Sequence, residues 1–189
     1  MRLFIALKLP AEVLDELTAV QQRLRRTEAH PVKWVAPQSI HLTLQFLGEV
    51  PEAHLPAILQ ALEEVRDAAA HQSPLRLRLA AAGAFPNLRR PQTLWVGMAG
   101  ELEGLTRLHQ AVIAATEPLG FQPETRPFRA HLTLGRVRRE ATPAQRAALG
   151  SALGSLSPPR SITWQSGHPL LFKSTLTPTG SIYTELGPA

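Results

Sequence analysis

The tetrapeptide His-Leu-Thr-Leu occurs twice in this chain of 189 residues, once at His41–Leu44 and once at His131–Leu134. Each copy lies in an apolar stretch that is typical of a β-strand, SIHLTLQFLGEV in the first case and FRAHLTLGRV in the second. The two copies begin 90 residues apart, which is close to half the length of the chain. A repeat at this spacing predicts two duplicated lobes that face each other.

The rest of the chain alternates between two hydrophobic periods. Apolar residues recur at helical spacing in segments 11–26, 52–70, 101–120 and 142–153. Strand-like segments lie between these helices, at 3–7, 32–35, 39–50, 75–83, 93–98, 128–137, 161–165, 168–176 and 181–186. The order lacks the steady βαβ alternation of a parallel sheet and predicts an α+β fold. We expect residues 1–189 to form a single bilobal domain, with pseudo-symmetric lobes, antiparallel sheets and flanking helices around a central cleft.

Composition restricts the chemistry that is available. The chain has no cysteine, which excludes disulfides, thiolate nucleophiles and cysteine-bound zinc. Its net charge is +5, and all but three of the 20 basic residues are arginines, which bind phosphate groups in a bidentate way. This charge favours a phosphate-bearing partner such as nucleic acid. No signal peptide and no apolar run long enough to span a membrane is recognisable, so a cytoplasmic protein is expected.

Alternation along a strand assigns the two halves of the motif to different faces. His41 and Thr43 share one face, and the leucines between and after them share the other. The same parity holds for His131 and Thr133. The leucines are therefore expected in the core, and so is Phe46, which falls on the leucine face. Each histidine and threonine pair is then displayed toward the cleft.

Two imidazoles in one cleft are suited to general acid and base catalysis near neutral pH. Two threonine hydroxyls can donate hydrogen bonds to the oxygens of a phosphate group. This set fits in-line attack on a phosphodiester without a metal ion. It fits a zinc site less well, because threonine is a poor ligand. The sequence also lacks the GxSxG, P-loop and GxGxxG motifs of other enzyme classes.

With these two blocks, the chain resembles the two-histidine (2H) phosphoesterase superfamily, whose signature is a pair of His-x-Thr-x motifs. Within it, the chain is similar to the bacterial and archaeal RNA 2′,3′-cyclic phosphodiesterases, also called 2′-5′ RNA ligases. The resemblance is carried by RLFIALKLP at the start, by KWVAPQSIHLTLQFLGEV and by FRAHLTLGRV, in that order. It covers nearly the whole chain.

The resemblance implies a role for each motif residue. His131 would be the proton acceptor that activates water, and His41 the proton donor to the leaving ribose oxygen. Thr43 and Thr133 would hold the phosphate oxygens. Strand parity places Arg136 on the leucine face, so we expect it to reach the phosphate only if the strand ends or bulges near Gly135.

The expected substrates are RNA ends that carry a 2′,3′-cyclic phosphate, tRNA fragments among them, or small cyclic nucleotides. We expect that the protein needs no cofactor or metal ion and that it is a monomer.

We predict that Phe4 stacks a base, although a place in the core is an open alternative for it, as it is for Trp34. His109 is expected on the surface. Arginines could form a basic rim for the RNA backbone: Arg89, Arg90, Arg126, Arg129, Arg138 and Arg139.

Three alternatives remain open from the sequence. The same site could join RNA ends by 2′-5′ ligation, which reverses a transesterification at the same atoms. The chain could instead be a non-catalytic RNA-binding module whose histidines only contact phosphate. The repeat could also be purely structural, in which case the two histidine faces would not meet.

Overall fold

The computed structural model describes residues 1–26, 31–70, 72–177 and 180–187. Within these residues, nine strands form one sheet in which every pairing is antiparallel. The strands are β1 (Arg2–Leu7), β2 (Val32–Trp34), β3 (Leu42–Glu49), β4 (Arg76–Phe85), β5 (Thr93–Gly100), β6 (His131–Val137), β7 (Thr163–Gln165), β8 (Leu170–Thr177) and β9 (Gly180–Leu186).

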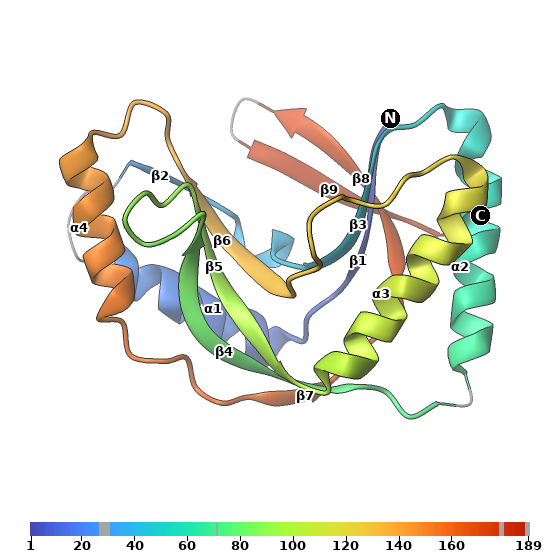
Figure 1. Cartoon of the computed structure of the whole chain (residues 1–189), viewed down its shortest axis with the longest axis horizontal. Coiled ribbons are helices and arrows are strands. Elements are labelled where there is room, and N and C mark those ends of the chain that lie inside the picture. Colours follow the sequence, from blue (N-terminus) through green and yellow to red (C-terminus); the bar gives the residue numbers. More distant parts are fainter. Residues whose placement is uncertain (27–30, 71, 178–179, 188–189) are drawn as a thin grey trace.

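The sheet is organised around its two motif strands. Its order is β7-β4-β5-β6-β3-β1-β8-β9, and β2 pairs with β6 outside this path. The motif strands β3 and β6 therefore lie side by side at the centre, with similar sets of strands on either side. The predicted α+β class and antiparallel pairing are confirmed. The strands of the two lobes form one continuous, curled sheet (Figure 1).

Each half of the chain gives strands to the other lobe, β2 and β4 from the first half and β8 and β9 from the second. Strand β4 follows β3 in the sequence, yet it pairs with β5 and β7 of the second half. Strand β8 comes late in the chain, yet it pairs with β1 at the N-terminus. The two lobes are thus interwoven, and neither consists of one continuous half of the sequence.

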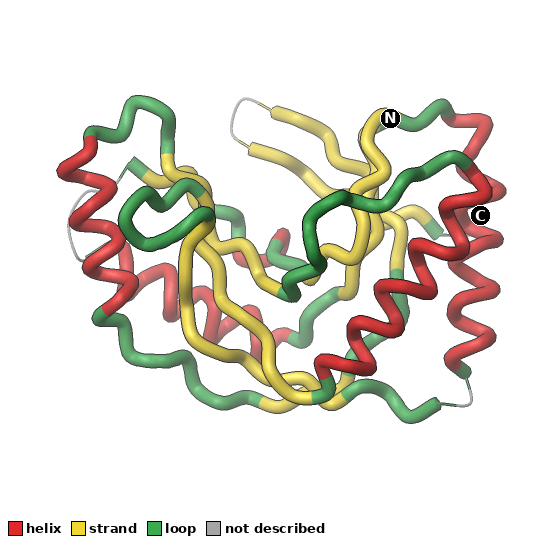
Figure 2. Tube along the Cα trace, in the orientation of Figure 1, coloured by secondary structure: helices red, strands yellow, loops and turns green. Residues whose placement is uncertain are grey.

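The helices cover the outside of the curled sheet in two groups (Figures 1 and 2). Helix α1 (Ala11–Arg25) and α4 (Pro143–Gly154) lie on one side, and α2 (Leu55–Ala69) and α3 (Leu102–Thr116) pack together on the other. Short 3-10 turns occupy η1 (Pro37–Ser39), η2 (Glu52–His54) and η3 (Glu117–Leu119). Among the described residues, no helix has the length and apolarity needed to span a bilayer.

Local sequence signals account for the helix positions. Val13, Leu17, Val20 and Leu24 recur at helical spacing, and all four are fully buried on the inner face of α1. Helix α4 begins at a capping box in which Thr142 and the third helical residue, Gln145, bond each other's backbone N–H. The predicted helices match those observed, except that the ends of two segments tighten into η2 and η3.

An ion pair between the buried Glu16 and the exposed Arg160 ties α1 to the segment that leads into β7. Glu16 is 4% exposed. Its carboxylate accepts hydrogen bonds from Arg160 Nε at 2.6 Å and from the Arg160 backbone N–H at 3.0 Å. Arg23 lies 3.4 Å from the same carboxylate. These contacts link residues about 140 positions apart in sequence and hold α1 against the sheet edge.

Candidate active site

The two motif strands meet through symmetric residues. Leu42 in β3 lies opposite Leu132 in β6, so the same position of each tetrapeptide is paired with its counterpart. These leucines are 1% and 0% exposed. The motif histidines and threonines are half-buried and line cavities on the opposite, concave face of the sheet. The predicted division of the motif into a core face and a cleft face is confirmed.

Each motif histidine is oriented by the same backbone contact. His41 Nδ1 lies 2.8 Å from the carbonyl oxygen of Ser39, and His131 Nδ1 lies 2.7 Å from that of Arg129. In both cases the carbonyl belongs to the residue two positions earlier. A carbonyl oxygen can only accept, so each Nδ1 carries the proton that it donates. Each Nε2 is then left to accept or donate a proton during a reaction.

Five of the predicted site residues line one cavity, and Phe4 in β1 is one of them. The central cavity, about 340 Å³ in volume, is bordered by His41, Thr43, Thr133 and Arg136, together with Tyr183 and other residues of β1, β3, β8 and β9. His131 borders an adjoining space of about 380 Å³, which we call the His131 cavity. Thr43 and Phe46 line both spaces, and so the two histidines flank one continuous cleft.

His41 sits in an aromatic setting that opposes its protonation. Its ring stacks on Phe4 at 4.6 Å between ring centroids, and it lies at right angles to the ring of Tyr183 with the centroids 5.1 Å apart. Burial lowers the pKa of His41, the Ser39 carbonyl raises it, and the charge of His131 lowers it again.

Phe4 packs against His41 and is almost fully covered by its neighbours. Its side chain is 2% exposed. His41 stacks on the ring at 4.6 Å and Phe172 at 5.3 Å, and Tyr183 meets it edge-on at 5.0 Å. This burial fits the alternative of a place in the core, although the ring borders the central cavity, and stacking on a nucleobase stays a prediction. Its contact with His41 makes it a support for the imidazole.

Both motif strands bulge at the last leucine of the motif. In β3, Thr43 pairs with Ala6 and Gln45 pairs with Ile5, so Leu44 is an extra residue. In β6, Thr133 pairs with Trp95 and Gly135 pairs with Leu94, so Leu134 is extra. A bulge of this kind reverses the facing of the residues that directly follow it. Two consecutive residues are buried in each strand as a result.

The bulge in β6 turns Arg136 toward the cleft. The condition set by the sequence, a bulge near Gly135, is met, and Arg136 lines the central cavity. Its Nη1 donates to Thr93 Oγ1 at 3.2 Å. The bulged carbonyl of Leu134 accepts hydrogen bonds from the backbone N–H of Val35 and from the side chain of Gln21, both at 2.9 Å.

The bulge in β3 turns Phe46 toward the cleft. Parity predicted this side chain in the core, but it is 53% exposed and borders both the central and the His131 cavities. Gln45 takes the core position instead, where it accepts a hydrogen bond from Thr116 of α3 at 2.8 Å. Sequence reasoning missed Phe46 because it assumed an unbroken alternation.

Several aromatic rings line the His131 cavity. Phe85 meets His131 edge-on at 4.9 Å between ring centroids. His109 stacks on Phe128 at 4.1 Å between ring centroids, is half-buried and lines the cavity. Burial lowers the pKa of His109, and the nearby Glu124 raises it. This wall offers flat apolar surface next to the imidazole of His131.

The predicted basic rim divides into two sets. Arg126 and Arg129 line the His131 cavity. The other four predicted arginines are exposed on two loops and line none of the cavities described here: Arg89, Arg90, Arg138 and Arg139. Arg146 of α4 joins these loops, because its guanidinium donates to the carbonyls of Pro91 and Arg138 at 2.8 and 2.9 Å.

Trp34 is packed rather than free. Its ring is half-buried, with Arg25 above it at 5.1 Å from the ring centroid. It lies opposite Gly135 in the β2–β6 pairing. Trp34 therefore belongs to the wall of the site. In the part of the chain that the structure describes, no three His, Cys, Asp or Glu side chains are grouped so as to hold a metal ion.

The arrangement has clear relatives among known proteins. The family described as LigT like Phosphoesterase matches the chain twice, over residues 7–95 and 96–183, with one motif in each match. The RNA 2′,3′-cyclic phosphodiesterase of Archaeoglobus fulgidus is 34% identical over 189 residues, covering 98% of each chain. The second match reproduces the internal duplication that the repeated tetrapeptide predicts.

Solved structures show the same fold. The crystal structure of TT0787 of Thermus thermophilus superimposes with a TM-score of 0.78 at 32% identity, covering 98% of this chain and 95% of that one. E. coli LigT complexed with 3′-AMP gives a TM-score of 0.75 at 27% identity, with 98% and 94% covered. By sequence over its whole length, by fold and by its paired His-x-Thr strands, the chain belongs to the LigT-like phosphoesterase family of 2H phosphoesterases.

Proposed function

We propose that this protein is a metal-independent RNA 2′,3′-cyclic phosphodiesterase that acts as a monomer in the cytoplasm, with residues 1–189 as one catalytic domain. The observation that carries the proposal is the matched pair of imidazoles. Each has its Nδ1 held by a carbonyl two residues earlier, and the two flank one cleft lined by threonine hydroxyls. Relatives that cover the chain end to end are named for this activity.

In the proposed reaction, water attacks the phosphorus in line with the bond to the ribose 3′ oxygen. His131 Nε2 removes a proton from the water as the new P–O bond forms. His41 Nε2 gives a proton to the 3′ oxygen as the old P–O bond breaks. The product is an RNA end with a 2′-phosphate and a free 3′-hydroxyl. Thr43, Thr133 and Arg136 hold the non-bridging oxygens, where negative charge increases in the transition state.

We further propose that Phe46 takes the stacking role that the sequence assigned to Phe4. Its ring is exposed beside the central cavity, on the same concave face as His41 and Thr43. Aromatic stacking is a common way to hold an unpaired RNA base. The related E. coli LigT has been solved with 3′-AMP, which supports a nucleotide as the bound group.

The test is hydrolysis of an oligonucleotide that ends in a 2′,3′-cyclic phosphate, in the presence of EDTA. We expect turnover in EDTA and a product that carries only a 2′-phosphate. Phosphatase sensitivity and mass spectrometry of the terminal nucleotide distinguish 2′- from 3′-phosphate. Tight, salt-sensitive RNA binding with no turnover would instead support a non-catalytic RNA-binding module.

One observation favours 2′-5′ ligation as a second activity. A water molecule needs far less room than the aromatic His131 cavity of about 380 Å³ provides on the side from which the nucleophile enters. A nucleoside with a 5′-hydroxyl could occupy this space and attack in place of water. Incubating RNA ends with 2′,3′-cyclic phosphate and 5′-hydroxyl, held together by a complementary strand, tests this. A linkage resistant to nucleases specific for 3′-5′ bonds is the expected product.

A further inference from the structure

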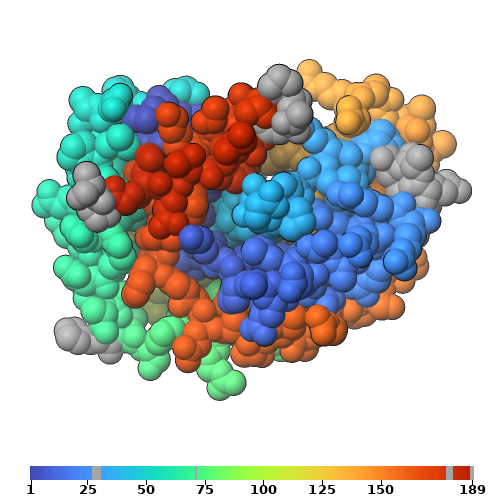
Figure 3. Space-filling model, turned by 180° about the vertical axis from the view of Figure 1, so that it is seen from behind, coloured from blue at the N-terminus to red at the C-terminus, as the bar shows by residue number. Residues whose placement is uncertain are grey.

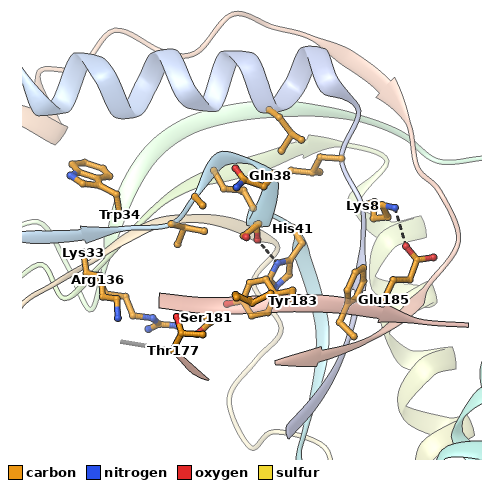
Figure 4. Close-up of a pocket in the computed structure, with 18 residues that line it drawn as sticks. Lys8, Lys33, Trp34, Gln38, His41, Arg136, Thr177, Ser181, Tyr183 and Glu185 are labelled. Atoms are coloured by element: carbon orange, nitrogen blue, oxygen red, sulfur yellow. Dashed lines mark hydrogen bonds and ion pairs between the residues drawn. The ribbon is translucent and has the colours of Figure 1, made fainter. Parts of the chain in front are cut away.

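A third space opens from the catalytic cleft on the side of His41. This hairpin cavity, about 750 Å³ in volume, lies between the α1–β2–η1 segment and the β8–β9 hairpin (Figure 4). It shares His41, Arg136 and Tyr183 with the central cavity. Seen from behind, the surface is hollowed between the red strands of the hairpin and the blue segment of α1 and β2 (Figure 3). The cleft therefore continues past the reacting phosphate.

The hairpin cavity is larger than the reaction itself requires. Cavities that bind small molecules measure about 300–1,000 Å³, so a further nucleotide fits this volume. Ser181 and Tyr183 offer hydroxyl groups on the hairpin side. Ile182 also lines the cavity and is 57% exposed, which gives a base or ribose an apolar surface.

Two cations face each other at one end of this cavity. Lys33 in β2 lies directly opposite Arg136 in β6, and both line the cavity. Like charges placed opposite each other on neighbouring strands destabilise a sheet. Neither cation has an ion-pair partner among the residues that the structure describes. A phosphate group next to both would remove this repulsion.

At the other end of the cavity, the positive charge of Lys8 is neutralised by an acidic partner. Lys8 Nζ bonds the carboxylate of Glu185 at 2.9 Å, on the far side of His41 from Lys33 (Figure 4). An anion is thus favoured at the Lys33 end. Arg136 borders both the central and the hairpin cavities, whereas Lys33 borders only the hairpin cavity of the two. Lys33 is therefore placed further from the reacting phosphate than Arg136, on the side of the hairpin cavity.

We infer that the hairpin cavity binds the nucleotide that precedes the cyclic end, with Lys33 contacting the phosphodiester that joins it to the terminal nucleotide. This inference rests on the proposed function. In that reaction His41 faces the ribose and His131 faces the attacking water, so the RNA chain must leave the terminal ribose on the His41 side. The enzyme thereby distinguishes an RNA end from a cyclic mononucleotide.

The test compares kcat/KM for adenosine 2′,3′-cyclic phosphate with kcat/KM for the dinucleotide that carries one more adenosine on its 5′ side. We expect the wild-type enzyme to favour the dinucleotide about tenfold, as for one charge-assisted contact. Lys33→Gln should reduce that ratio toward one. For the dinucleotide, it should also make the slope of log(kcat/KM) against log[salt] shallower by about 0.7.

The matched control is Lys173→Gln, which removes the same charge from a lysine that lines none of the cavities described here. It should leave the ratio and the salt slope as they are in the wild type. A wild-type ratio near one, or equal ratios in the wild type and Lys33→Gln, would overturn the inference while leaving the proposed function intact.

A binding measurement separates the inference from the proposed function. If neither substrate is turned over, the proposed function fails. The inference is then decided by the Kd of a fluorescent dinucleotide that ends in a 2′-phosphate. Weaker binding to Lys33→Gln than to Lys173→Gln would support the subsite, and equal binding would overturn it.

Discussion

Phe46 and Arg136 occupy equivalent positions in the two motif strands. Each lies five residues after its motif histidine, and each is turned into the cleft by a bulge at the last leucine of the motif. The duplication has thus placed an aromatic ring on one side of the cleft and a guanidinium on the other. The aromatic ring suits a base and the guanidinium suits a phosphate. The two duplicated strands therefore form a site whose two sides differ in chemistry.

We expect this asymmetry to appear in the kinetics of single variants. Arg136→Gln should lower kcat/KM about 10- to 100-fold for every substrate, because it removes charged hydrogen bonds to the phosphate. Phe46→Ala should lower it by a similar factor for a nucleotide but much less for an abasic ribose cyclic phosphate. Phe46→Tyr should restore activity. Equal losses on both substrates for Phe46→Ala would contradict a stacking role.

Replacing either motif histidine should abolish most of the turnover. His41→Asn and His131→Asn are each expected to reduce kcat about 10²- to 10⁴-fold, which is the usual contribution of a positioned proton donor or acceptor. Circular dichroism and thermal unfolding should show that both variants remain folded. His109→Asn serves as the control, because this histidine lies against the cavity wall and has no proposed proton-transfer role. Full turnover in either motif variant would rule out two-histidine catalysis.

The surroundings of His41 predict where activity is lost on the alkaline side. Burial and the charge of His131 lower the pKa of His41, so it should titrate below the ordinary histidine value of about 6.5. A proton donor must be protonated, and kcat/KM should therefore fall as pH rises through this lowered pKa. NMR titration of the ring should give the same midpoint, shifted upward in His131→Gln. If the midpoint instead matches the pH at which kcat/KM rises on the acid side of the pH profile, His41 is the proton acceptor.

Gly135 should tolerate no side chain. A Cβ there would lie 2.7 Å from Val32 Cγ1 and 3.1 Å from the carbonyl oxygen of Lys33. Gly135→Ala should displace β2, destabilise the fold by about 1–3 kcal/mol and raise KM through Arg136. Gly167→Ala is the control, because nothing lies within 4 Å of its added Cβ. Urea unfolding and steady-state kinetics measure both effects, and unchanged values for Gly135→Ala would show that β2 yields freely.

The buried carboxylate of Glu16 should make stability depend on acid pH. Burial raises its pKa, but the hydrogen bonds and charge of Arg160, with the charge of Arg23, lower it further, to a net value below 4.5. The ionised form is thus favoured in the folded state, and its contribution is lost as pH falls through the lowered pKa. Glu16→Gln should cost about 1–3 kcal/mol at pH 7 and less below pH 4.

Urea unfolding at both pH values measures this difference. Glu63→Gln, an exposed position on α2, should show little change at either pH. A cost for Glu16→Gln that stays constant between pH 7 and pH 3 would mean that the carboxylate charge does not contribute to stability.

The sequence predicted most of the architecture and which residues of the two motifs face the cleft. Alternation and helical periodicity depend on local burial, so they located the elements and placed Leu42, His41 and Thr43 on the correct faces. Alternation failed at Phe46 because a bulge depends on how two strands pair, and the sequence of one strand does not contain that information. It left the burial of Phe4 open because its cover comes from Phe172 and Tyr183 near the other end of the chain.

The exchange of β4 and β8 has a consequence for separating the halves of this protein. A fragment that ends before β5 would contain β4 without either of its pairing partners, and the remaining fragment would contain β8 without β1. Each fragment would expose unpaired strand edges, which promote aggregation. Mixed together, the two fragments could reassemble the sheet. Two copies of one half-length chain that traded their last strands would reproduce the same arrangement as a symmetric dimer.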